Sequence, residues 1–187
     1  MVELTENEGE LALLLARRAL ETTIALAPEE PVILPPVFSE NRGVFVTLKK
    51  NGELRGCIGY PYPLYPLGQA IRAAAVAAAT EDPRFPPVSP GELGALTIEV
   101  TVLTPPEKLS CAACDRDRAI EVGRHGIIIT GPGCQGLLLP QVAAEYGWDS
   151  ATFLDHTCMK AGLPPGYWRR EETEVMVFEG QIITEQR

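Results

Sequence analysis

The dipeptide Asn51-Gly52 constrains the fold more than any other feature of this sequence, because it separates two apolar runs in GVFVTLKKNGELRGCIGY. Asn-Gly is preferred in type I′ turns, whose two central residues take positive φ and whose twist matches the strands that they join. The sequence therefore predicts an antiparallel β-hairpin. Cys57 falls near the end of the second strand, and the neighbouring Gly56 and Gly59 permit a bulge or the close approach of another backbone.

Two helices are expected in the N-terminal half of the chain. The first follows a capping box made by Thr5 and Glu8 and runs to about Leu26. The second is the alanine-rich stretch 67–80, which is suited to close packing against another element. Prolines in the loop 27–42 exclude a helix there. The first helix is expected to bury an apolar face that comprises Leu11, Leu14, Leu15, Ala19, Leu20 and Ile24.

The C-terminal half adds strands and short helices, some of which begin or end at recognisable residues. Ser89 and Glu92 form a second capping box, and Gly147 is a typical left-handed residue at a helix end. The predicted strands are 95–103, with Leu96, Ile98, Val100 and Val102 on one face, then two strands within 118–130, a short strand in 134–140, and a strand or hairpin in 174–185. Since strands and helices do not alternate strictly, the predicted fold class is α+β, with a largely antiparallel sheet flanked by helices.

The charge of the chain bears on its partners. The 16 Lys and Arg residues stand against 25 Asp and Glu residues, a net charge of −9, which argues against a nucleic-acid-binding protein. The composition, with 45% hydrophobic and 22% charged residues, is that of a folded protein. The opening stretch MVELTENEGE is acidic, the wrong sign for a signal peptide, so we expect a cytoplasmic protein with no membrane association.

The chain has five cysteines, an odd number that favours reduced thiols over a disulfide framework. Cys111 and Cys114 form a Cys-x-x-Cys pair in what looks like a solvated loop, and whether this pair has a redox or metal role stays open. No second pair stands at zinc-binding spacing, and the sequence has neither a Walker loop nor a Gly-x-Gly-x-x-Gly fingerprint. We therefore expect neither a metal nor a cofactor.

Six stretches together resemble the AMMECR family of archaea, bacteria and eukaryotes. The family's hallmark is the hexapeptide LRGCIG, and the resemblance covers nearly the whole chain in the right order. The stretches are LRGCIG at 54–59, DPRFPP at 82–87, IEVTVLT at 98–104, EVGRHGIII at 121–129, LLLPQVAAEYGW at 137–148 and FLDHTCMKAGLP at 153–164.

The resemblance implies a fold and a set of partners, but no established reaction. It implies one AMMECR-like domain over 1–187, made of two closely packed lobes whose boundaries the sequence does not resolve, with the hexapeptide lining a cleft. Prokaryotic genes of this family often accompany those of a Memo-like protein and a radical S-adenosylmethionine enzyme. This association implies a place in a shared modification pathway.

The hexapeptide supplies the first candidate site residues. On a regular strand Arg55 and Cys57 project to the same face, and a nearby guanidinium makes a thiol more reactive. A bulge at Gly56 would instead turn the two apart. We regard Cys57, Arg55 and His125 as candidate catalytic residues, with His125 as the base because its glycine-flanked turn lies in EVGRHGIII, one of the stretches that resemble the family. The candidate substrate-binding residues are Gly56, Gly59, Arg84 and Gln135, where Arg84 and Arg55 together would hold an anion.

Two functional hypotheses follow, and the sequence leaves both open, so whether the protein is an enzyme is undecided. In the first, the protein is a component of the modification pathway that binds a small anionic or side-chain substrate in a cleft at Arg55, Gly56 and Cys57. In the second, it is a non-catalytic module that binds a protein or peptide, and Cys57 is structural. The second is favoured by the two histidines and four serines of the chain, from which no complete catalytic constellation can be assembled.

Overall fold

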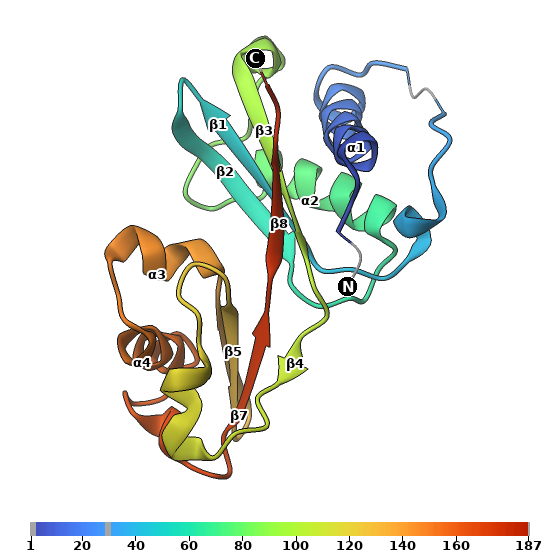
Figure 1. The fold of residues 1–187 in the computed structure, drawn as a ribbon. Coiled ribbons are helices and arrows are strands. Elements are labelled where there is room, and N and C mark those ends of the chain that lie inside the picture. The colour runs from blue at the N-terminus through green and yellow to red at the C-terminus, as the bar shows by residue number, and fades with distance from the viewer. Residues whose placement is uncertain (1–2, 29–30, 187) are drawn as a thin grey trace. The chain divides into compact units, whose positions relative to one another are not determined.

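The computed structural model describes residues 3–28 and 31–186, so residues 29 and 30 of the predicted loop lie outside the described part. The chain forms two compact units, of which the first comprises Met1–Leu103 with Gln181–Arg187 and the second Thr104–Gly180 (Figure 1). Each unit contains a four-stranded sheet and helices, which confirms the α+β class with antiparallel sheets.

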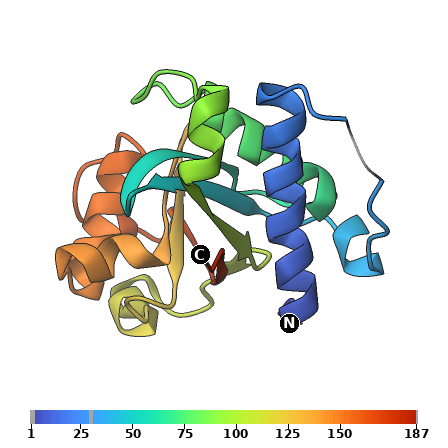
Figure 2. The ribbon, with the colours of Figure 1, turned by 90° about the horizontal axis from the view of Figure 1, so that it is seen from above.

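The first unit is a sheet with both of its long helices on one side (Figures 1 and 2). The strand order is β2-β1-β3-β8, so β2 and β8 are the edge strands. Its elements are α1 (Glu6–Ile24), the short 3₁₀ helix η1 (Pro36–Ser39), β1 (Val44–Lys50), β2 (Glu53–Tyr60), α2 (Leu67–Thr80), the 3₁₀ helix η2 (Pro90–Ala95), β3 (Leu96–Leu103) and β8 (Gly180–Thr184).

The predicted hairpin is formed by β1 and β2, and its turn is of the predicted type. Asn51 has a φ of 54° and Gly52 a φ of 83°, which are the positive values of a type I′ turn. The pairing shifts between Leu48 and Lys49, because Lys49 pairs with Leu54 whereas Leu48 pairs with Gly56. Arg55 is therefore an extra residue on β2, a β-bulge.

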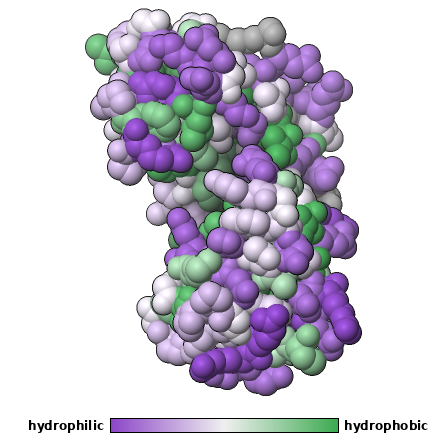
Figure 3. Space-filling view, turned by 90° about the vertical axis from the view of Figure 1, so that its left-hand side faces the viewer, coloured by the Kyte–Doolittle hydropathy of each residue, from purple (hydrophilic) through white to green (hydrophobic). Residues whose placement is uncertain are grey.

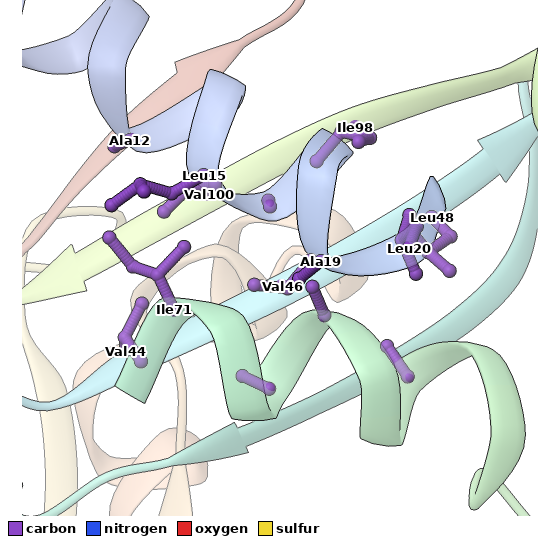
Figure 4. Close-up of a cluster of buried hydrophobic side chains, with 14 of the residues drawn as sticks. Ala12, Leu15, Ala19, Leu20, Val44, Val46, Leu48, Ile71, Ile98 and Val100 are labelled. Atoms are coloured by element: carbon purple, nitrogen blue, oxygen red, sulfur yellow. The ribbon is translucent and has the colours of Figure 1, made fainter. Parts of the chain in front are cut away.

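The core of the first unit lies between the sheet and the two helices (Figure 4). Both predicted capping boxes are confirmed, and the four predicted core residues of β3 are buried, although burial alternates only from Leu96 to Val100 because Thr101 and Leu103 are buried too. The predicted face of α1 was partly wrong, because Leu14 is 37% exposed whereas Ala12 and Ala16 are buried. The small side chains of Ala12 and Ala16 allow α1 to pack closely on the alanine-rich α2, and this rotates the buried stripe away from Leu14.

The second unit is built around a sheet with the strand order β4-β7-β5-β6. Its core includes Phe153 and Leu154 of α4 together with Trp168. The elements are β4 (Glu107–Lys108), the 3₁₀ helix η3 (Ala113–Ala119), β5 (Gly126–Gly131), β6 (Cys134–Leu138), α3 (Pro140–Tyr146), α4 (Ser150–Lys160), the 3₁₀ helix η4 (Tyr167–Arg169) and β7 (Glu174–Phe178).

Two sequence predictions for this half of the chain were wrong. Residues 118–130 contain one strand rather than two, because the backbone N–H groups of Arg124 and His125 donate to the carbonyl of Glu121 and close a turn before β5. The C-terminal strands are not a hairpin, because β7 pairs with β5 and β4 whereas β8 belongs to the sheet of the first unit.

Polar and apolar side chains are intermixed on the face of the molecule drawn in Figure 3. Within residues 3–28 and 31–186, no helix combines the length and the apolar character that a membrane crossing requires.

Candidate functional site

The backbone of Cys57 is held at the open edge of the first sheet by two side chains from the loop after α2. The N–H of Cys57 donates to Oδ2 of Asp82 at 2.8 Å, and its carbonyl accepts from Nη2 of Arg84 at 3.4 Å. An edge strand has unpaired backbone groups that need partners. Asp82 and Arg84 therefore complete the edge of β2 in place of another strand.

Asp82 and Arg84 also form a bidentate ion pair with each other. Nε of Arg84 lies 2.9 Å from Oδ1 of Asp82, and Nη2 lies 2.7 Å from Oδ2. The Asp82 side chain is 2% exposed, whereas that of Arg84 is 53% exposed. The hydrogen bonds from Arg84, helped by the backbone N–H of Cys57, hold the pKa of Asp82 well below its usual range despite burial. The carboxylate of Asp82 is therefore buried in its ionised form, and the guanidinium of Arg84 paired with it is partly exposed.

Arg55, the bulged residue, binds the loop and η2 beyond α2. Its Nε lies 3.1 Å from Oε1 of Glu92, and its Nη1 donates to the carbonyl of Pro86 at 2.9 Å. The Arg55 side chain is only 12% exposed, and its hydrogen bonds are the main reason that the pKa of Glu92 is well below its usual range. The structure thus contains the bulge that the sequence left open. The guanidinium of Arg55 joins β2 to η2 and to the loop before it.

Gly56 and Gly59 each allow a close approach to β2, as predicted. A Cβ on Gly56 would lie 2.0 Å from the carbonyl oxygen of Ala78 in α2, and a Cβ on Gly59 would lie 2.4 Å from the ring of Phe45. Neither glycine has positive φ. The approaching atoms belong to the protein itself, so packing accounts for both glycines, and their role as substrate contacts stays a prediction.

The side chain of Cys57 lies on the face of the sheet opposite the two helices. Cys57 pairs with Thr47 of β1, and Thr47 pairs with Glu99 of β3, so the three residues form a row across three strands on one face. Thr47 Oγ1 donates to Cys57 Sγ at 3.3 Å, and Lys49 Nζ lies 3.1 Å from Oε2 of Glu99. We call Cys57, Thr47 and Glu99 the polar row; its thiol is half-buried.

Thr47 and Lys49 were missed by sequence reasoning. The alternation of GVFVTLKK is visible in the sequence and places both residues on the face opposite Val46. The register that brings Thr47 to Cys57, however, depends on the bulge at Arg55, which the sequence allowed only as one of two alternatives.

His125 and Gln135 belong to the second unit. Nδ1 of His125 accepts from the backbone N–H of Glu121 at 3.1 Å, and Nε2 of Gln135 donates to Oγ1 of Thr130 at 2.9 Å. Their expected partnership with Cys57 stays a prediction. In the described part of the chain, no three His, Cys, Asp or Glu side chains are grouped as a metal ion requires.

Comparison with known proteins decides the family. The AMMECR1 family matches residues 13–183. The chain belongs to the AMMECR1 family. A protein of Methanosarcina acetivorans is 53% identical over 97% of this chain and 94% of its own length. A Methanothermobacter thermautotrophicus protein is 50% identical over 97% of this chain and 96% of its own.

The fold is also that of a solved structure. The crystal structure of an uncharacterized protein from Pyrococcus horikoshii is similar with a TM-score of 0.89 and 46% identity. The similarity covers 98% of this chain and 94% of that one. The AMMECR1 fold is therefore shared over the full length, whereas the names of these relatives assign no activity.

The first prediction concerns Gly56, the third residue of LRGCIG. Gly56→Ala should lower the free energy of unfolding by about 3 kcal/mol or more, because the new Cβ collides with a helix carbonyl that cannot move alone. At Gly91 a Cβ would meet nothing within 4 Å, so Gly91→Ala should change stability by less than about 1 kcal/mol. Urea unfolding measures both, and equal effects would refute the packing role.

The second prediction concerns Asp82. Because its pKa is lowered in the folded state, its ionised form stabilises the fold at neutral pH, and this contribution is lost as the pH falls below the ordinary carboxyl pKa of about 4. Asp82→Asn should therefore cost on the order of 2 kcal/mol near neutral pH and less in acid. Glu53→Gln at the exposed hairpin turn is the control, and a pH-independent loss in Asp82→Asn would contradict the account.

Proposed function

We propose that this AMMECR1 protein is a cysteine-dependent component of a modification pathway and binds a small anionic molecule or a modified side chain at Cys57. One observation carries the proposal. Arg55, Gly56 and Gly59 of the hexapeptide are accounted for by packing, whereas Cys57 is half-buried and its side chain lies on the face of the sheet opposite α1 and α2. A residue held so firmly by its backbone, with its reactive atom turned outward, suits a site better than a core.

The charges around Cys57 favour a compact anion. Arg84 is bound to the carbonyl of Cys57, and about half of its side chain is exposed. The chain as a whole carries a net charge of −9, which repels polyanions, whereas a single fixed guanidinium binds a carboxylate or phosphate locally. Both arginines are paired with a carboxylate, but the side chain of Arg84 is 53% exposed and that of Arg55 only 12%, so Arg84 is the one that an anion can reach.

The polar row orients the thiol of Cys57. Thr47 donates its hydroxyl hydrogen to Sγ of Cys57 at 3.3 Å, and this contact directs the sulfur, the atom with which a cysteine attacks electrophiles. Glu99 lies two strands away from Cys57 on the same face and forms an ion pair with Lys49. We propose that Thr47 orients the thiol of Cys57.

A second candidate function is a non-catalytic module that binds a protein or peptide. It is favoured by the same packing of Arg55 and the two glycines, since a motif that braces a fold needs no chemistry. In either function we propose a radical S-adenosylmethionine enzyme and a Memo-like protein as partners, on the basis of the family resemblance.

The third prediction tests the site with two reagents of different charge. Native protein is alkylated with iodoacetate and with iodoacetamide, and modification of Cys57 is followed by peptide mass mapping. Arg84→Gln should lower the iodoacetate-to-iodoacetamide rate ratio at Cys57 by about threefold, because a partly exposed charge contributes up to about 1 kcal/mol. Arg84→Lys should largely keep the ratio.

The control for this experiment is Arg18→Gln, which removes the same charge from α1 on the other side of the sheet. It should leave the ratio unchanged. A ratio that does not respond to Arg84→Gln, or a Cys57 that resists both reagents in the native protein, would refute the anion site.

The fourth prediction separates the two candidate functions. The tagged protein and its Cys57→Ser variant are each mixed with the purified radical enzyme and Memo-like protein, and complex formation is measured by sedimentation. Both forms should bind the partners. Only the unchanged protein should allow the assembled pathway to form its modified product, which is followed by mass spectrometry. If Cys57→Ser supports modification fully, Cys57 is structural and the binding module is the correct function. If neither partner binds either form, the pathway assignment is wrong.

A further inference from the structure

We propose a docking site for a short, basic, extended segment of another protein at the free edge of β8, beneath α1. The two elements border a groove of about 500 Å³ in the first unit. Figure 1 shows β8 at the edge of the sheet, with α1 on the side of the sheet that carries the core. This site is separate from Cys57 and does not depend on the proposed chemistry.

The edge of β8 has backbone groups available for another strand. β8 is the last strand in the order β2-β1-β3-β8. The N–H of Glu185, just after β8, donates to the carbonyl of Ile98 in β3. Since backbone groups alternate between the two sides of a strand, those of Ile182 and Thr184 point to the free edge. An incoming strand therefore finds donors and acceptors at β8.

Both ends of the groove are closed by side-chain contacts. At one end, the amide group of Gln181 binds the backbone N–H of Leu4 at 2.8 Å and its carbonyl at 2.9 Å. At the other end, Arg17 forms an ion pair with Glu185 and donates to the carbonyl of Leu96 at 2.7 Å. The five positions from Gln181 to Glu185 span about 17 Å at the rise of an antiparallel strand. The groove therefore fits a segment of about five extended residues.

The roof and floor of the groove are apolar. Gly9 of α1 lets the helix approach Ile183, since a Cβ there would lie 3.3 Å from that side chain. Leu13 and Leu14 of α1 also line the groove, and Leu14 is 37% exposed. Alternate side chains of an added strand would face this helix, and at these positions β-branched or aliphatic residues gain most from burial.

The charge of the groove selects a basic occupant. Glu6 and Glu10 line it from α1 and are exposed, and neither side chain forms an ion pair or a side-chain hydrogen bond with the rest of the described chain. The cation in the lining, Arg17, is already paired with Glu185. Lysine or arginine in the incoming segment would therefore meet unpaired carboxylates.

The same charge disfavours a second copy of this chain as the occupant. Pairing two β8 edges about a two-fold axis would bring Glu6 and Glu10 of one copy toward the same residues of the other. Like charges at a contact oppose association. The fitting partner is therefore a different protein with a basic strand or tail.

The proposal is tested by selection from a library of random peptides of about eight residues, displayed on phage, against the full-length protein. The enriched peptides should alternate apolar residues with Lys or Arg and lack a central proline. Synthetic copies should bind the Glu10→Lys variant at least about tenfold more weakly, whereas the control Glu145→Lys, an exposed charge reversal in α3, should not matter. Backbone amides of Ile182 and Thr184 should exchange more slowly in the complex.

Three results would overturn the proposal. The first is a selection that enriches no sequence. The second is a set of enriched peptides that bind Glu10→Lys and the unchanged protein equally, or that leave hydrogen exchange at β8 unaltered. The third is a protein that sediments as a dimer whose β8 amides are already protected, which would make a second copy the occupant.

Discussion

The β-bulge at Arg55 is the constraint on which the candidate site depends. In a hairpin closed by a two-residue turn, regular pairing would place Cys57 opposite Val46, on the face that packs against α2. The extra residue shifts the register, so that Cys57 lies opposite Thr47 instead. Because side chains alternate between faces, a one-residue shift moves each following residue to the other face. Because of the bulge, Gly56 lies beneath α2, and Cys57 lies on the opposite face of the sheet.

The bulge is held by contacts on both sides of β2. Arg55 binds Glu92 of η2 and the carbonyl of Pro86, and Asp82, in the same loop as Pro86, binds the N–H of Cys57. Gly56 in turn fits against the carbonyl of Ala78. In the hexapeptide LRGCIG, the residues around Cys57 thus have packing roles, and the side chain of Cys57 lies on the face opposite the helices.

Sequence patterns predicted local structure well where a residue type has one conformational use. Asn51-Gly52 gave the turn type, and Thr5 with Glu8 gave the start of α1. The patterns were weaker where the answer depends on a partner distant in sequence. The spacing of Leu14 predicts a buried residue, yet Leu14 is 37% exposed because Ala12 and Ala16 occupy the contact with α2.

The same reasoning explains what was found and missed at the site. Cys57 and Arg84 stand in recognisable motifs and were predicted, and they meet at the edge of β2. Thr47 and Lys49 were missed because they have no distinctive sequence signal, and only the shifted register brings Thr47 to the thiol. The brace between Arg55 and Glu92 joins residues from β2 and η2, a contact that no local spacing predicts.

The register of the hairpin is the most direct test of this account, and nuclear Overhauser spectroscopy of the labelled protein measures it. Residues that lie directly opposite each other in an antiparallel pair bring their α-protons close together where no hydrogen bonds join them. The account predicts a strong cross-peak between the α-protons of Thr47 and Cys57. A cross-peak between the α-protons of Thr47 and Gly56 in its place would mean that the bulge is absent, and that the thiol lies on the face beneath α2.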